Sequence, residues 1–431
     1  MYLRIFSFLL LGLLAANAAP APTREAVINE TLHPYDGPSE HGVNVSTLTG
    51  KVMCGYQGWF AVEGDGADRG WFHWTKGRGP LGPGNAKIDL LPDVRELTPE
   101  ERFPTDFHLA DGSVVDAFSS FKKPTVVRHF AWMKEYGIDG GFVQRFVGGM
   151  RDPRSFRQNN VVLANCREGA NRAGRAYALM YDLSGLGAGR MNEVIDDWKT
   201  LREHMHLTDD PAYLHHRGKP VIAVWGVGFS DHRAYTIAEC KDLVEYLKKD
   251  GCTVMLGVPA HWRDLTADAL PDPALLEVLK LADIVSPWTV GRFGDLPGVK
   301  RHSEKLLVPD LAWCRDQHLD YLPVVFPGFS WHNMKGGKLD QIPRQQGKFL
   351  WAQLAAAKRA GAEMIYVAMF DEVDEGTAIF KCTNDVPPAG ESAFVTYEGL
   401  PSDYYLRLTG MGGRMLRGEI PVTDEPPDLK K

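Results

Sequence analysis

The sequence has no surplus of basic residues, few cysteines and only one long apolar run. Lysine and arginine number 48 against 55 aspartates and glutamates, which gives a net charge of −7 over 431 residues. Without a basic footprint, nucleic acid is not an expected partner. Six cysteines are too few for a disulfide framework of this size, and no C-x-x-C pair indicates a zinc or redox site. One or two disulfides remain compatible with the six, and Cys240 with Cys252 is the pair nearest in sequence.

The one long apolar run lies at the N-terminus and is too short to span a bilayer. Arg4 precedes the apolar residues 5–14, and Ala16-Asn17-Ala18 supplies the small-x-small pattern of a signal-peptidase site. This pattern predicts a signal peptide over residues 1–18 and a secreted or periplasmic protein that leaves the membrane after cleavage. A buried N-terminal helix is the alternative. We expect a proline-stiffened tether over 19–48 and a polar tail over 421–431.

Between these ends, short apolar runs alternate with amphipathic segments. The expected strands are 52–60, 140–146, 176–182, 220–225, 253–257, 283–286, 322–326 and 364–370. The expected helices are 124–136, 155–173, 192–206, 236–249, 273–282, 303–318, 344–361 and 402–417. Eight strands, each followed by a helix, predict an α/β fold with a single (β/α)8 TIM barrel over 49–420 and long βα loops. A doubly wound open sheet is the competing architecture.

Polar and aromatic residues follow nearly every expected strand, and the carboxyl ends of barrel strands are where barrel enzymes gather their chemistry. We therefore expect one ring-shaped substrate-binding site. Its candidate residues are Tyr56, Gln57, Trp59, His73, Trp74, Gln144, Arg145, Tyr181, Asp182, Trp225, His261, Trp262, Trp288, Trp331, His332, Asn333 and Asp371.

The densest group of ionisable residues comes directly after the eighth expected strand, where Asp371, Glu372, Asp374 and Glu375 stand within five positions. Crowded carboxylates repel one another and raise at least one pKa, which keeps a carboxyl group protonated for general-acid catalysis near neutral pH. Glu372 and Glu375, three positions apart, are the expected catalytic pair. A solvated acidic loop is the alternative.

The aromatic clusters at 55–60, 71–74 and 326–333 combine flat apolar faces with hydrogen-bonding neighbours, a mixture that suits sugar rings. Core packing is the alternative for any single aromatic residue. No P-loop, dinucleotide fingerprint or G-x-S-x-G elbow occurs, and we expect neither a cofactor nor a metal site. The acidic stretch 63–68 lacks the full calcium-loop signature, so a solvated turn is the preferred interpretation.

At these residues the chain resembles the glycoside hydrolase family 71/99-like group, and in particular the family 99 endo-α-mannosidases. That family carries Phe-Asn-Glu-Trp-x-Glu-Gly-Thr at the end of its last barrel strand, and Phe370-Asp-Glu-Val-Asp-Glu-Gly-Thr377 resembles it. Tyr56-Gln-Gly-Trp-Phe60 and His73-Trp74 are similar to two further family elements. The chain departs from the pattern at Asp371, where the family has Asn, and at Val373, where a bulky Trp is missing. Relatives of this group also carry the label "xylosidase/arabinosidase".

The resemblance implies that Glu372 deprotonates the sugar 2-hydroxyl and that Glu375 is the general acid/base. The sequence thus predicts an exported, monomeric glycoside hydrolase that cleaves a polysaccharide or oligosaccharide with retention. The second hypothesis is a carbohydrate-binding barrel of the same fold that has lost catalysis.

Overall fold

The computed structural model describes residues 22–388 and 390–429. The expected signal peptide and the first residues of the expected tether lie outside the described residues.

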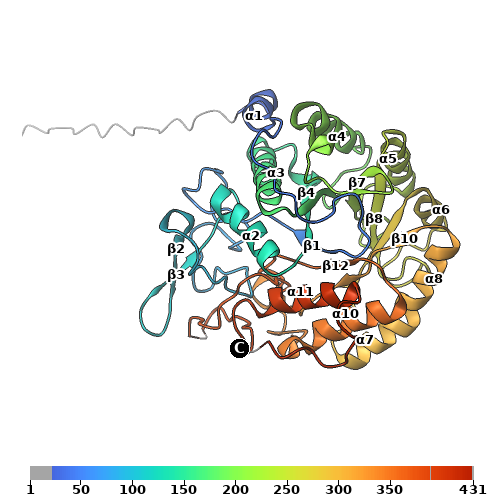
Figure 1. The fold of residues 1–431 in the computed structure, drawn as a ribbon. Coiled ribbons are helices and arrows are strands. Elements are labelled where there is room, and N and C mark those ends of the chain that lie inside the picture. The colour runs from blue at the N-terminus through green and yellow to red at the C-terminus, as the bar shows by residue number, and fades with distance from the viewer. Residues whose placement is uncertain (1–21, 389, 430–431) are drawn as a thin grey trace, which may run out of the picture.

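Eight parallel strand positions form a closed barrel with helices around it (Figure 1). In sheet order they are β1 (Val52–Tyr56), β4 (Gly140–Phe146), β5 (Ala176–Asp182), β7 (Lys219–Trp225), β8 (Thr253–Pro259), β9 (Ile284–Trp288), β10 (Asp320–Tyr321) with β11 (Val324–Val325), and β12 (Ile365–Val367). The seventh position is split in two at Pro323, whose ring nitrogen cannot donate to a neighbouring strand. Its first half pairs with β9 and its second half with β12, so the ring closes.

Burial on both faces explains why the strands have continuous apolar runs rather than alternating ones. All seven residues of β8 are buried, and so are all five of β1. One face of each strand packs inside the barrel and the other against the helical layer. The closed ring confirms the predicted TIM barrel and rules out the open doubly wound sheet.

Helices follow most strands, close to the expected ranges. They are α2 (Lys123–Glu135), α3 (Pro153–Ala173), α4 (Asn192–Met205), α5 (Ile237–Lys249), α6 (Ala274–Leu281), α7 (Leu296–His302), α8 (Val308–Asp316), α9 (His332–Lys335), α10 (Lys348–Ala360) and α11 (Tyr404–Leu416). Outside the barrel, β2 (Phe103–His108) pairs with β3 (Val114–Ala117), and β6 (His215–His216) pairs with β7. The expected helix over 303–318 is helical over 303–316, but its first turn, 303–307, is a π-helix that precedes α8, and the helical run begins earlier, with α7.

The segment 19–48, expected as a tether, contains helix α1 (Arg24–Thr31), which packs against α3. Thr23 caps the helix, Val27 is fully buried, and Arg157 of α3 makes an ion pair with Glu30. The tertiary contacts with α3 order this short helix, which has no strong amphipathic pattern of its own to reveal it.

Two further expectations concern the cysteines and the acidic stretch 63–68. All six cysteines are buried free thiols, so the suggested Cys240–Cys252 disulfide is wrong. In the acidic stretch, Asp65 is buried and accepts hydrogen bonds from the backbone of Val62 and Ala67 and from the Ser119 hydroxyl. Its carboxylate therefore holds the turn together.

Candidate active site

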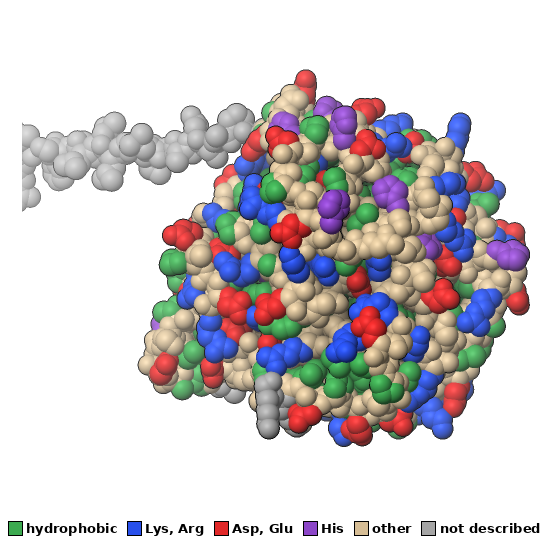
Figure 2. Space-filling model, viewed as in Figure 1, with side chains coloured by type: hydrophobic (Ala, Val, Ile, Leu, Met, Phe, Trp, Pro, Cys, Tyr) green, Lys and Arg blue, Asp and Glu red, His purple; other side chains and the backbone are tan. Residues whose placement is uncertain are grey.

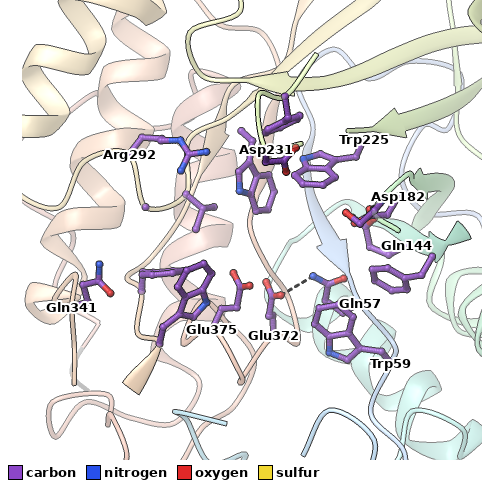
Figure 3. A pocket seen from close by; sticks show the side chains of 18 residues that line it. Gln57, Trp59, Gln144, Asp182, Trp225, Asp231, Arg292, Gln341, Glu372 and Glu375 are labelled. Atoms are coloured by element: carbon purple, nitrogen blue, oxygen red, sulfur yellow. Dashed lines mark hydrogen bonds between the residues drawn. The ribbon is translucent and has the colours of Figure 1, made fainter. Parts of the chain in front are cut away.

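A cavity of about 490 Å³ lies at the carboxyl ends of the barrel strands (Figure 3). Nine predicted residues line it: Gln57, Trp59, Gln144, Asp182, Trp225, Trp288, Trp331, Glu372 and Glu375. They come from seven different strand ends or loops, which only the closure of the barrel brings together.

Nine lining residues were not predicted: Phe146, Ser184, Phe229, Asp231, Val290, Gly291, Arg292, Phe329 and Gln341. Phe146 could have been predicted from the sequence, because it ends the expected strand 140–146 and strand alternation places it on the same side as Gln144. Phe329 belongs to the aromatic cluster 326–333 that the sequence indicated, and the other seven lie on loops after the strands, whose conformation the sequence does not predict. Asp231 and Arg292 are also paired, with Arg233 and Asp268 respectively.

Ten predicted residues lie outside the cavity. They are Tyr56, His73, Trp74, Arg145, Tyr181, His261, Trp262, His332, Asn333 and Asp371.

Strand alternation accounts for Arg145 and Tyr181, because neighbours along a strand point to opposite faces. Gln144 and Asp182 enter the cavity, whereas Arg145 and Tyr181 point outward to Asp197 of α4. The Arg145 Nε–Asp197 Oδ2 distance is 2.5 Å, and the Tyr181 hydroxyl donates to the same oxygen at 2.7 Å. These three buried side chains tie β4 and β5 to the helical layer.

Packing and loop contacts account for most of the others. Trp74 is fully buried beside Phe60, Trp262 packs against Trp313, and the Tyr56 hydroxyl bonds His129 at 2.8 Å. His332 bonds the carbonyl of Gly337, and the Asn333 amide donates to the carbonyls of Ile88 and Ala393.

Glu372 lies at the floor of the cavity with a donor on each carboxylate oxygen. The Gln57 amide donates to Oε1 at 2.9 Å (Figure 3). The Thr377 hydroxyl donates to Oε2 at 3.0 Å. Burial and the nearby charge of Glu375 raise the pKa of Glu372 well above its ordinary value, while the Thr377 hydrogen bond acts in the opposite direction.

Glu375 faces the same cavity (Figure 3), which Trp331 also lines. Burial and the charge of Asp374 raise the pKa of Glu375 to about 7, and a hydrogen bond from the Trp331 side chain opposes that rise. A carboxyl group with this pKa is still half protonated at neutral pH, as a general acid must be. Because Glu372 and Glu375 interact, they titrate as a pair.

Asp371 and Asp374 turn away from the cavity and serve the loops around it. Both oxygens of Asp371 accept backbone N–H groups, from Gln57 at 2.7 Å and Gly58 at 2.8 Å, and thereby fix the end of β1. Burial raises the pKa of Asp371 to about 7. Asp374 Oδ2 lies 2.8 Å from His73 Nδ1 and 3.6 Å from the Lys87 ammonium.

Aromatic side chains form two walls of the cavity. Trp59 stacks on Phe146 with ring centroids 4.9 Å apart, and Trp225 lies edge-on to Trp288 at 5.6 Å. Asp182 lies near the second wall, and burial raises the pKa of its carboxyl group. The cavity therefore combines apolar platforms with a few polar groups, a typical composition for a small-molecule or sugar site.

No protein-family model and no curated protein sequence matches this chain. Its structure is similar to that of the GH99 endo-alpha-mannosidase from Bacteroides thetaiotaomicron, with a TM-score of 0.63 and 18% identity over 86% of this chain and 99% of that one. A second structure of a GH99 endo-alpha-mannosidase from that organism, in complex with BIS-TRIS-propane, has the same TM-score and coverage at 16% identity. The chain has a GH99-type fold.

The GH99-type barrel carries no candidate metal cluster of His, Cys, Asp and Glu within the described residues. Among those residues there is also no helix long and apolar enough to cross a membrane.

Proposed function

We propose that this protein is a glycoside hydrolase whose working pair is Glu372 and Glu375. The observation that carries the proposal is a buried pair of interacting carboxyl groups at the floor of an aromatic-walled cavity. The likeness to GH99 structures and the sequence resemblance to that family point the same way. The substrate we propose is a polysaccharide or oligosaccharide.

The two carboxyl groups have different roles because their surroundings differ. Burial raises the pKa of Glu372, but two fixed donors, from Gln57 and Thr377, stabilise its ionised form against that rise, and in this proposal Glu372 accepts the proton of the sugar 2-hydroxyl. Oxygen 2 then attacks the anomeric carbon, the glycosidic bond breaks, and Glu375 gives its proton to the leaving oxygen. In the second half, Glu375 takes a proton from water, water opens the anhydro-sugar, and oxygen 2 regains its proton from Glu372. Two displacements give net retention.

The test begins with a panel of neutral, acetylated and acidic polysaccharides incubated with the full-length protein. On any glycan that the parent cleaves, Glu375→Gln and Glu372→Gln should each lower kcat/KM by about 10²–10⁴-fold, the usual contribution of a general acid or base. Glu363→Gln is the matched control, since Glu363 is exposed and precedes the same strand, β12, at the opposite end of the barrel. Equal activity in all three variants would remove the pair from the mechanism.

Stereochemistry tests the roles separately. Proton NMR of the first-formed product should show the anomer of the substrate, and an inverted product would refute the anhydro-sugar route while leaving the glycosidase proposal intact.

The aromatic walls also favour a second candidate, a carbohydrate-binding barrel without catalysis. Binding alone does not require two buried carboxyl groups, so the enzyme is the better-supported reading. Glu375→Gln discriminates between the two hypotheses. If the protein is an enzyme, the parent cleaves glycan and the variant only binds it. If the protein is a lectin, the parent and the variant both bind glycan and neither cleaves it.

Export is a proposal from the sequence alone. Expression of the full chain in a secreting host, followed by N-terminal sequencing, should give a mature protein beginning at Ala19. An intact Met1 on protein retained in the cell would refute it.

A further inference from the structure

A second hollow, of about 830 Å³, lies beside the candidate active site. Residues 62–79 of the loop after β1 form most of its lining, together with Lys87 and Arg154. We call it the basic hollow. Its cationic side chains are Arg69, Lys76, Arg78, Lys87 and Arg154, and its acidic ones are Glu63 and Asp68. This local excess of positive charge contrasts with the net −7 of the chain and with the face in Figure 2, where basic and acidic side chains are interspersed.

Three of the cations in the basic hollow make no close ion pair, although the charge of Asp152 lies near one of them, Arg154. The side chains of Lys76, Arg78 and Arg154 are exposed and make no ion pair or hydrogen bond with any other described residue. Lys87, in contrast, lies 3.6 Å from Asp374, and Arg69 donates to Gln158 at 2.9 Å. Cations gathered in one hollow repel one another and raise the local concentration of anions.

Aromatic faces accompany these charges. Trp71 and Phe72 are partly exposed in the hollow, and the Arg69 guanidinium lies 3.5 Å from the centroid of the Phe72 ring. Aromatic rings in the same hollow as exposed cations suit a sugar that carries an acidic group, because a ring packs against the C–H face of the sugar and a cation binds the anion.

The basic hollow adjoins the cavity of Glu372 and Glu375 through one stacked pair. Trp59 lines the cavity, His73 lines the basic hollow, and their rings stack with centroids 3.8 Å apart and planes 9° apart. Burial lowers the pKa of His73, so this shared wall is neutral near pH 7. The two hollows are therefore separated by the thickness of one pair of stacked rings.

We propose that the basic hollow is a subsite for an anionic group, a carboxylate or a sulfate ester, on a glycan whose reacting sugar occupies the cavity. The placement of the reacting sugar in the cavity rests on the proposed glycosidase function, whereas the binding of an anionic group in the basic hollow does not. Binding of an acidic glycan in the basic hollow can be measured without turnover.

The experiment compares two triple variants of the full chain in a Glu375→Gln background, which prevents cleavage. The first is Lys76→Gln/Arg78→Gln/Arg154→Gln. The matched control, Lys280→Gln/Arg315→Gln/Arg359→Gln, removes one lysine and two exposed arginines from helices α6, α8 and α10. Calorimetry measures binding of three glycan probes of equal length, which are an oligogalacturonide, a sulfated galactan oligosaccharide and a neutral galactan oligosaccharide. A single-stranded DNA oligomer is the fourth probe.

We expect the parent to bind at least one acidic probe more tightly than the neutral one. The hollow variant should weaken that binding about tenfold, the sum of three modest exposed ionic contacts, and the control variant should not. Added salt should weaken the binding in parallel. Preference for the carboxylated or the sulfated probe identifies which anion the subsite takes.

Three results would overturn the inference: no preference for an acidic probe, equal binding by the hollow variant and the parent, or tighter binding of a single-stranded DNA oligomer than of any glycan. Failure of the proposed function is distinguishable from these. It appears as absent turnover in the parent protein, while the binding difference between the two triple variants remains.

Discussion

At the residue scale, Asp374 connects the catalytic candidates to their surroundings without lining the cavity. Its buried carboxylate bonds His73 and faces Lys87, and its charge raises the pKa of both Glu372 and Glu375. A negative charge beside a carboxylic acid favours the protonated form, which is the form a general acid needs. Asp374 is thus a positioning residue for the proton on Glu375.

The first prediction is that Asp374→Asn lowers the pKa of Glu375 from about 7, because one source of repulsion against its ionised form is removed. The alkaline limb of kcat/KM should move to lower pH, and carbon-13 NMR of labelled glutamate carboxyl groups should show the same shift in the free protein.

Asp316→Asn, a change at an exposed position on α8, is the control and should leave the profile in place. A profile of Asp374→Asn that overlays the parent would contradict the coupling. A parent profile without an alkaline limb would remove Glu375 as the general acid.

At the scale of elements, α11 shows how a glycine permits close packing that a helical pattern does not reveal. A Cβ on Gly410 would lie 1.8 Å from the carbonyl oxygen of Tyr136, just beyond the end of α2. On the same helix, a Cβ on Gly413 would meet the flexible end of Arg417 at 3.2 Å and a methyl group of Val52 at 3.4 Å.

The second prediction compares these two glycines. Gly410→Ala should destabilise the protein by about 1–3 kcal/mol, since α11 must move away from the Tyr136 backbone. Gly413→Ala should be neutral or stabilising, because Arg417 can move and alanine favours the helix by about 0.5–1 kcal/mol over glycine. Thermal unfolding followed by circular dichroism distinguishes them, and equal melting temperatures would show that α11 is not held against α2.

At the scale of the whole molecule, the buried carboxyl groups make stability depend on pH. The pKa of Asp371 and that of Glu375 are both raised to about 7 in the folded chain by burial. Between the ordinary carboxyl pKa and pH 7, the folded state therefore binds more protons than the unfolded state, and the free energy of unfolding falls as pH rises.

The third prediction is that Glu375→Gln raises the melting temperature at pH 8 by a few degrees relative to the parent, with a smaller difference at pH 5. At high pH the parent must bury an ionised carboxylate at position 375, which lowers its free energy of unfolding. The glutamine is uncharged and does not have this cost. A pKa raised from 4.5 to about 7 corresponds to about 3 kcal/mol at alkaline pH. Differential scanning calorimetry from pH 5 to 8 measures it, with Glu363→Gln as control. If the difference in melting temperature between Glu375→Gln and the parent did not change with pH, the folded protein would not be burying an ionised Glu375 at high pH.

The sequence by itself determined the barrel and pointed to two glutamates, Glu372 and Glu375, that line its cavity. Strands buried on both faces leave continuous apolar runs, and 140–146 and 176–182 match the observed strands residue for residue. The sequence could single out Glu372 and Glu375 as candidates because repulsion among neighbouring carboxylates is a local property of the chain, and their catalytic role stays a prediction. The apolar runs of the strands and the crowded carboxylates are both visible in consecutive residues, so they can be recognised without knowledge of distant contacts.

Only the tertiary structure decided which strand-end residues enter the cavity. Arg145 and Tyr181 stand beside Gln144 and Asp182, yet they point outward to Asp197, a partner about 15 to 50 positions away. Helix α1 and the basic hollow also depend on such distant contacts: α1 packs on α3, and Arg154 joins a loop some 80 residues earlier. The sequence pattern sets the face that a side chain takes on its own strand, but the packing of the closed barrel decides what lies opposite that face.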